Sequence, residues 1–181
     1  MNIALYERNE NDMDVLTAIK ERRSIRSYLP KEVEPEKLKK VLEAARLAPS
    51  ARNLQNWKFI AVQDKNTINL LVDACNGQSF VGEAPVFIAA CALEDGGLMG
   101  CGIPRHVVDV SIAMTHIILE AYEQGLGTCW LGSFNQEKVK NILGIPDKAV
   151  VVAVTPLGYP AGSVSARPRK AFEEVVSYEK F

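Results

Sequence analysis

The stretch Pro85-Val86-Phe87-Ile88-Ala89-Ala90-Cys91 is an uninterrupted run of apolar residues near the middle of the chain. A strand with one face in water alternates apolar and polar residues, so a continuous run indicates a strand that is covered on both faces. This stretch therefore predicts a layered fold in which a buried strand lies between other elements.

Further strands and helices are expected on either side of this run. The apolar patterns predict strands at 57–62, 128–131 and 150–155, and helices at 14–22, from 35 to at most 48, 67–75, 107–124 and 135–143. Pro35 suits a first helical turn and Gly125 is a natural helix stop. Because strands and helices alternate irregularly, the sequence predicts an α+β layered fold and neither a bundle nor a barrel.

Size and charge limit the class of protein. The 181 residues suit one domain spanning 1–181, with residues 1–12 as a loose N-terminal arm. Hydrophobic residues make up 48 % of the chain and charged residues 24 %, and the formal net charge is −1. This balance argues against a nucleic-acid or membrane partner, which would need a broad basic face.

The cysteines indicate a reducing compartment. They stand at 75, 91, 101 and 129, without a C-x-x-C pair or a histidine at ligand spacing, so we expect free thiols and no metal site. Nothing in the sequence near Cys129 is expected to lower its pKa. The acidic N-terminal segment is unlike a targeting peptide, and no apolar run reaches the ~18 residues of a membrane span, so a cytoplasmic location is expected.

The segment 107–124 is apolar over more of its circumference than a surface helix needs. Either the rest of the domain wraps around it, or a second subunit covers the remainder. We favour the second subunit.

Arg22-Arg23-Ser24-Ile25-Arg26 places three guanidinium groups within five residues, directly after a predicted helix. Arginine keeps its charge at ordinary pH and grips phosphate oxygens with two donors. Arg167-Pro168-Arg169 adds two more such groups near the C-terminus. Local positive charge in a nearly neutral chain indicates a small anionic ligand.

A turn rich in amides follows the second predicted helix, at residues 49–57. Asn53 and Gln55 offer paired donors and acceptors for the edge of a heteroaromatic ring, and Ser50 and Ala51 are small enough for close approach. No G-x-G-x-x-G turn follows a strand, so neither a Rossmann-type nor a Walker-type phosphate site is supported. Flavin mononucleotide (FMN), with one phosphate and a polar-edged ring, fits this set of residues.

With these motifs the sequence resembles a short member of the nitroreductase family, from about Val15 to Val176. The resemblance rests on the arginine cluster together with Ala48–Trp57, Ala84-Pro85, Gly125–Gly132, Leu157-Gly158-Tyr159-Pro160 and Arg167-Pro168-Arg169.

The resemblance implies a central, mostly antiparallel sheet flanked by helices, in an intertwined homodimer with two FMN sites at its interface. The residues that it places around the cofactor are Arg22, Arg23, Ser24 and Arg26 with Arg167 and Arg169 from one subunit, Pro49, Ser50, Ala51, Asn53 and Gln55 from the partner, and Gln78, Leu131 and Gly132 beside the ring.

The resemblance also implies the chemistry. NADH or NADPH would deliver hydride to flavin N5, and a small acceptor such as a nitroaromatic or a quinone would then occupy the same place, which predicts ping-pong kinetics. The flavin would carry the reaction, so no catalytic acid, base or nucleophile is expected. Another flavin reaction on the same fold (dehalogenation, ring oxidation or flavin breakdown) and flavin binding without turnover are the alternatives.

Some features depart from the family pattern or stay open. Larger members have an acidic residue where this chain has Leu131, and residues 94–106 lack the aromatic lid of those members. Arg52 could reach the cofactor, the substrate or only water. Trp57 and Trp130 are expected to be core residues, because each lies beside a predicted strand.

Overall fold

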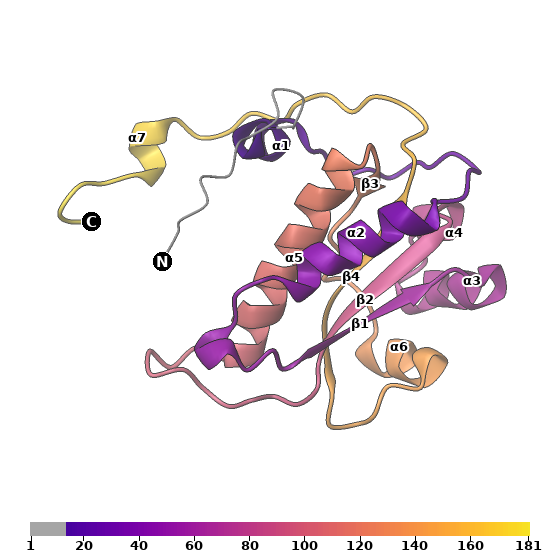
Figure 1. The fold of residues 1–181 in the computed structure, drawn as a ribbon, viewed down its shortest axis with the longest axis horizontal. Helices are drawn as coiled ribbons and strands as arrows, with labels where there is room; N and C mark the ends of the chain where they lie inside the picture. The colour runs from indigo at the N-terminus through magenta and orange to yellow at the C-terminus, as the bar shows by residue number, and fades with distance from the viewer. Residues whose placement is uncertain (1–13) are drawn as a thin grey trace, which may run out of the picture.

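The computed structural model describes residues 14–181, and the predicted arm at 1–12 lies outside them. Its centre is a four-stranded sheet of β1 (Trp57–Val62), β2 (Val86–Ala92), β3 (Gly127–Thr128) and β4 (Val150–Gly158), in the order β1-β2-β4-β3. Every pairing in this sheet is antiparallel. The predicted α+β fold with a mostly antiparallel sheet is thus confirmed (Figure 1).

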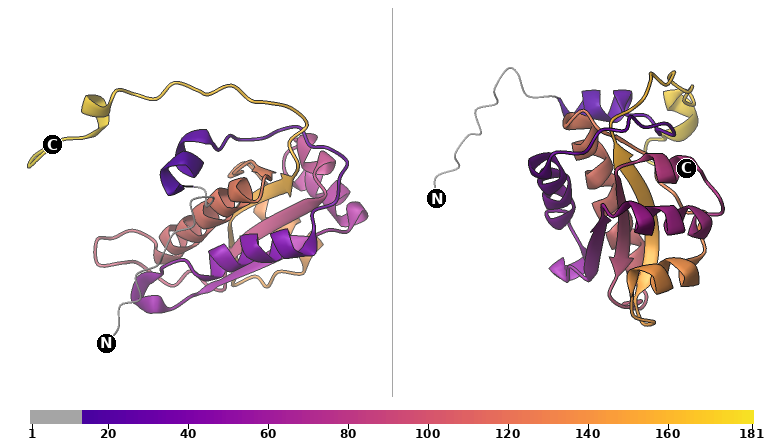
Figure 2. Two further views of the ribbon diagram at one scale, coloured as in Figure 1. Left: turned by 45° about the horizontal axis from the view of Figure 1, so that its top comes forward. Right: turned by 90° about the vertical axis from the view of Figure 1, so that its right-hand side faces the viewer.

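Helices cover both faces of the sheet. α2 (Pro35–Arg46) and α5 (Arg105–Glu123) pack on one face, and α3 (Lys65–Ala74), α4 (Phe80–Glu83) and α6 (Gln136–Leu143) lie on the other (Figure 2). α1 (Val15–Glu21) lies against α5, and α7 (Phe172–Val175) belongs to the C-terminal segment.

The residues of β2 alternate between two hydrophobic cores. Phe87, Ala89 and Cys91 pack with α3 and α6, whereas Ile88 and Ala90 pack with α2 and α5. All seven residues of β2 are buried. The expected strand with two covered faces is confirmed.

Several helices begin and end for identifiable local reasons, of which the role of Pro35 was expected. Pro35 occupies the first turn of α2, the Asp64 carboxylate accepts a hydrogen bond from the Thr67 amide at the start of α3, and Gly144 ends α6 in the left-handed conformation. The short helices α4 and α7 were not expected from the sequence. Within residues 14–181 no helix is long and apolar enough to cross a bilayer.

The predicted strand at 128–131 is only partly correct. Gly127 and Thr128 pair with β4, and Leu131 bridges Val154 in the same register, but the ladder is interrupted between them. The cause lies in β4: Pro156 has no amide to donate, and the Cys129 amide instead donates to the Thr155 hydroxyl, at 3.1 Å.

The chain after β4 forms an extended C-terminal arm, residues 161–181. It passes over α1 and carries α7 away from the sheet (Figures 1 and 2). Nearly all of its residues are exposed, including Phe172, Val175, Tyr178 and Phe181.

Candidate functional site

The segment 22–26 lies beside the short edge strand β3. The Ile25 amide donates to the Thr128 carbonyl at 2.8 Å, and Ser24 bridges Thr128 in parallel. The Ile25 side chain is buried, whereas Arg22 and Arg23 are half-buried and Arg26 is exposed. The buried isoleucine therefore fixes a backbone from which the neighbouring guanidinium groups reach the surface.

These guanidinium groups line a surface cavity of about 370 Å³, which we call the arginine pocket. Its lining comes from α1, from the segment after it and from the C-terminal arm. The lining residues are Ile19, Lys20, Arg22, Arg23, Ser24, Arg26, Val164, Ser165, Ala166, Arg167 and Arg169. This list contains six cationic side chains and no carboxylate.

The electrostatics of the pocket favour a bound anion. Burial lowers the pKa of the Arg22 guanidinium, and the positive charges of Arg169 and Arg23 lower it further. The Arg23 side chain donates to the carbonyls of Lys20 and Arg22, but its Nε is buried without a hydrogen-bond partner. A phosphate would supply both the missing acceptor and the missing negative charge, so these residues fit the phosphate of a mononucleotide.

Cys129 lies next to this cluster. Burial raises the pKa of its thiol. The positive charge of Arg26, a hydrogen bond from Ser24 and the positive charge of Arg22 act in the opposite direction and lower this pKa. The expectation that nothing near Cys129 would lower its pKa is therefore wrong, because the fold brings residues from 22–26 against it. Burial outweighs these charges, so the thiol remains protonated near neutral pH.

The root of the C-terminal arm is tied to the segment that follows the arginine cluster. The Leu29 amide donates to the Tyr159 carbonyl at 2.8 Å, and the Ala161 amide donates to the Ser27 carbonyl at 3.0 Å. Among the described residues, the next hydrogen bond along the arm is that of Ala171 to Glu174. The two segments that supply the arginines therefore diverge from one short paired stretch.

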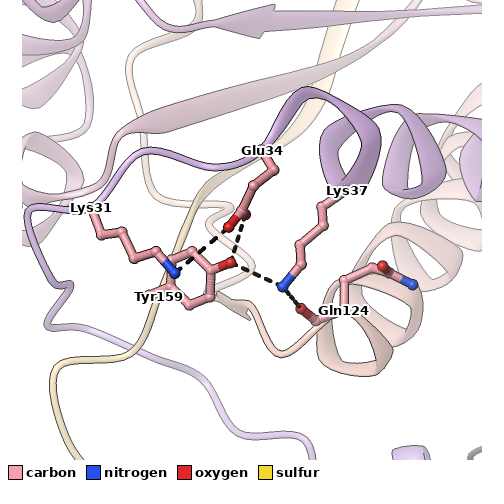
Figure 3. A network of polar contacts seen from close by, with 5 residues as sticks. All are labelled: Lys31, Glu34, Lys37, Gln124 and Tyr159. Carbon is pink, nitrogen blue, oxygen red and sulfur yellow. Dashed lines mark hydrogen bonds and ion pairs between the residues drawn. The ribbon is translucent and has the colours of Figure 1, made fainter.

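A set of polar contacts, which we call the Tyr159 network, reinforces this root (Figure 3). The Tyr159 hydroxyl donates to Glu34 Oε2 at 2.6 Å and accepts from Lys37 Nζ at 2.9 Å, and Lys37 also donates to the Gln124 carbonyl. The Lys31 ammonium lies 3.8 Å from the centroid of the Tyr159 ring. The hydrogen bond from Tyr159 lowers the pKa of Glu34, and that to Tyr159 raises the pKa of Lys37, so both stay charged.

The amide-rich turn at 49–55 has an unusual backbone. Arg52, Asn53 and Gln55 all have positive φ, at 54°, 55° and 50°. Each such residue other than glycine costs about 1–3 kcal/mol and persists only where its surroundings hold it, frequently at functional sites. Side chains accept from two backbone amides of this turn: the Ser50 hydroxyl accepts from the Gln55 amide, and the Asp109 carboxylate accepts from the Ala51 amide, both at 3.0 Å.

This turn lies away from the arginine pocket within one protomer. Asp109 belongs to the start of α5, whereas Arg22 and Ser24 line a small cavity with Ile118 of the same helix. Thr115 lines the same cavity, so six to nine residues of helix, at 1.5 Å per residue, separate the two places by about 9–14 Å. A single chain therefore does not bring the two groups of predicted site residues together.

Gln78 and the segment 131–132 form a third group. The Gln78 side-chain amide donates to the carbonyls of Cys75 and Ser133, at 2.9 and 3.1 Å. Leu131 is buried and Gly132 is exposed. Gln78 thus holds the loop that follows Leu131, and none of these three residues lines the arginine pocket.

The placement of the predicted site residues is therefore as follows. The arginine pocket gathers Arg22, Arg23, Ser24, Arg26, Arg167 and Arg169; the turn at the start of α5 holds Pro49, Ser50, Ala51, Asn53 and Gln55; and the third group holds Gln78, Leu131 and Gly132. Arg52 is exposed, and no hydrogen bond or ion pair of its side chain is seen among the described residues. The prediction that Trp130 is a core residue is wrong: it is 37 % exposed and lines a cavity with Arg22 and Arg23.

The sequence interpretation missed Lys20, the arm residues 164–166 and Asp109. Lys20 could have been found from its position two residues before Arg22 on the same predicted helix. Asp109 could have been found because it lies four residues before Ala113, on the apolar face of its helix. Within residues 14–181 no group of three or more His, Cys, Asp or Glu side chains is arranged to hold a metal ion.

The chain is similar to known proteins in sequence and in fold. A model of the "Nitroreductase family" matches residues 19–93 and 74–159. A protein of Methanothermobacter thermautotrophicus with the provisional name NADH dehydrogenase/NAD(P)H nitroreductase is 38 % identical over 86 % of this chain and 82 % of its own length. The FMN reductase [NAD(P)H] of Bacillus subtilis is 30 % identical over 93 % of this chain and 74 % of its own.

A solved structure shows the same fold. The FMN-dependent nitroreductase from Clostridium difficile R20291 superimposes with a TM-score of 0.80 and 32 % identity, covering 92 % of this chain and 99 % of that one.

Proposed function

Because the chain belongs to the nitroreductase family, we propose that it is an FMN-dependent oxidoreductase that passes electrons from NADH or NADPH to a small acceptor such as a nitroaromatic or a quinone. The arginine pocket carries this proposal: six cationic side chains without a carboxylate, and a buried Arg23 Nε without a partner, form a site for a phosphate. The FMN named in relatives supplies a ligand with such a group.

In this proposal the side chains bind and orient, and the cofactor, when bound, accepts hydride and releases electrons to the acceptor. Arg22, Arg23, Arg167 and Arg169 would hold the phosphate, with Ser24 as a further donor. Arg26 lies at the exposed rim of the pocket, with its guanidinium 5.9 Å from the centroid of the Phe80 ring. There it would stabilise negative charge that develops on the bound ligand.

We further propose that the complete site forms between two copies of the chain. The turn at 49–55 lies about 9–14 Å along α5 from the cavity that Arg22 and Ser24 line, and in this proposal the turn of a second copy meets the arginine pocket. Apolar side chains that a second copy would cover are exposed on α1 (Val15, Leu16 and Ile19) and on the arm (Phe172, Val175, Tyr178 and Phe181).

Complementation between two variants tests the shared site. Arg22→Ala and Asn53→Ala are each expected to impair both sites of a homodimer. A heterodimer of the two would combine both substitutions in one site and leave the other intact, so co-expression should restore FMN binding in about half of the heterodimer sites. Calorimetric titration of the separately tagged heterodimer measures this. A heterodimer with no recovered site would place both groups in one chain.

The reaction itself is tested by absorption spectroscopy. The purified protein is expected to be yellow and to bleach when NADH or NADPH is added without oxygen, because the bound flavin is then reduced. Initial rates at several donor and acceptor concentrations should give parallel double-reciprocal lines, since both reactants use the same place in turn. Intersecting lines would contradict the ping-pong scheme, and a yellow protein that stays oxidised would indicate binding without turnover.

A panel of acceptors then distinguishes the reaction. Rapid reoxidation by nitroaromatics or quinones is the expected outcome. If the protein bleaches but neither class reoxidises it, the fold serves another flavin reaction.

A further inference from the structure

Asp109 is a buried acid that the proposed reaction does not use. It lies in the second turn of α5, on the face that carries the core residues Ala113 and Ile117, and it is 4 % exposed. A carboxylate at such a position is costly unless it is hydrogen-bonded. Among the described residues, its one hydrogen bond comes from the Ala51 amide, at 3.0 Å to Oδ1.

The partner of this hydrogen bond is the turn whose backbone most needs support. Ala51 opens the three-residue helical turn Ala51–Asn53, and Arg52, Asn53 and Gln55 follow with positive φ. Inside the turn the contacts are local: the Gln55 amide donates to Ser50, and the Gln55 side chain donates to the Asn53 carbonyl. Asp109 is thus the side chain from a distant element, 58 residues away in sequence, that ties the turn to the helical layer.

Asp109 also faces a cavity next to the turn. This cavity, of about 450 Å³, is lined by Leu54 and Asn56 after the turn, by Glu94, Asp95 and Gly96, and by Arg105, His106 and Asp109. The carboxylate therefore stands between the open space and the backbone of the turn.

We infer that Asp109 is a positioning residue for the flavin site: its carboxylate holds the turn 51–55, in which Arg52, Asn53 and Gln55 are left-handed, so that Asn53 and Gln55 are presented to the cofactor. The inference rests on the proposed function, because that function gives the turn its ligand. The essential property is an oxygen acceptor at this position and not the negative charge.

The experiment compares Asp109→Ala, which removes the acceptor, with Asp109→Asn, which keeps Oδ1 and removes the charge. Asp147→Ala is the matched control, because Asp147 is an exposed carboxylate in a surface loop. Two quantities are measured at a temperature where all proteins are folded: the dissociation constant of FMN, and hydrogen–deuterium exchange of the amides of residues 50–57 in FMN-free protein. Should the alanine variant fail to fold, Asp109→Leu replaces it, since leucine fills the buried space with a side chain of similar branching and offers no acceptor.

Asp109→Ala is expected to weaken FMN binding about 5- to 20-fold, the scale of one buried backbone amide left without an acceptor, and to speed exchange in residues 50–57. Asp109→Asn should stay within about twofold of the unsubstituted protein in both measurements, and so should Asp147→Ala. Unchanged affinity and exchange in Asp109→Ala would overturn the inference, and so would an asparagine variant that behaves like the alanine variant.

The two proposals fail in different ways. If the unsubstituted protein binds no FMN, the proposed function fails, while the exchange measurement still tests whether Asp109 holds the turn. If the unsubstituted protein binds FMN, and Asp109→Ala changes neither the FMN affinity nor hydrogen–deuterium exchange at residues 50–57, only the inferred role of Asp109 fails.

Discussion

Replacing Arg22 with alanine is expected to weaken FMN binding by about 1.5–3 kcal/mol, or about 10- to 150-fold in the dissociation constant. Arg22 is the half-buried member of the arginine pocket whose pKa is lowered by burial and by the charges of Arg169 and Arg23. A bound phosphate would relieve that repulsion, so the loss should exceed that of a solvent-exposed charge pair. Equilibrium titration of FMN-free protein, followed by flavin fluorescence, measures the change.

Arg46→Ala is the control for the change in net charge. Arg46 lies in the last turn of α2, where it pairs with Glu43 and lines no part of the arginine pocket. Arg46→Ala should keep the FMN dissociation constant within about twofold of that of the unsubstituted protein. The substitution breaks only an exposed ion pair away from the pocket, and such pairs contribute about 1 kcal/mol or less. Rising salt should also weaken binding less in Arg22→Ala than in the unsubstituted protein. Equal affinities for Arg22→Ala and Arg46→Ala would remove Arg22 from the site.

Gly127→Ala is expected to lower both stability and FMN affinity. A Cβ at Gly127 would lie 2.5 Å from Ile25 Cγ1 and 2.9 Å from Ile25 Cβ, closer than such atoms approach one another. Because Ile25 anchors the arginine-bearing segment beside β3, relief of the clash must displace that segment or the strand. Overpacking of this kind costs about 1–3 kcal/mol, which for a chain of this length lowers the melting temperature by about 2–12 °C.

Gly100→Ala is the matched control, because a Cβ there meets nothing within 4 Å and the residue is not in the left-handed region. Both substitutions reduce the freedom of the unfolded chain alike, so their difference isolates the clash. The double variant Gly127→Ala/Ile25→Ala should be less destabilised than the sum of the single variants, since the γ-carbons of Ile25 cause part of the clash. If thermal unfolding and FMN titration of Gly127→Ala match those of Gly100→Ala, the close packing of β3 on Ile25 does not position the arginines.

The layered fold could be predicted because its central elements have strong local patterns. The apolar run at 85–91 predicts a strand that is covered on both faces, and in the structure the side chains of β2 alternate between two hydrophobic cores. β1 occurs at the residues where a strand was expected, 57–62. These signals depend on neighbours along the chain, which a single sequence displays directly.

The strand expected at 128–131 failed for a reason that lies in another strand. Its apolar pattern is suitable for a strand. In the register of β3 with β4, however, Cys129 lies opposite Pro156, which cannot donate a ladder hydrogen bond. The pairing partner is unknown from sequence alone, so the interruption could not be foreseen. The same holds for Cys129, because the charges that act on its thiol come from residues 22–26.

The candidate site divides in the same way. The arginine motifs could be read directly, and the structure gathers them in one pocket. The backbone conformation of the 49–55 turn could not be predicted from the sequence. Positive φ usually shows in a sequence as a glycine, and here arginine and glutamine adopt it instead. The contribution of Asp109 required knowledge of which helix packs against the turn.

The bare stretch between the root of the C-terminal arm and α7 has a thermodynamic consequence. Residues 162–170 carry Arg167 and Arg169 but form no hydrogen bond among the described residues, whereas Arg22 and Arg23 rest on a backbone fixed by β3. When this stretch becomes ordered around a bound ligand, it loses conformational entropy, which costs about 1–2 kcal/mol for each residue fixed. This cost opposes ligand binding. The guanidinium groups of Arg167 and Arg169 are chemically identical to those of Arg22 and Arg23, but they therefore contribute less to the net free energy of ligand binding. The affinity for the ligand should also fall more steeply on warming than the contacts alone would suggest.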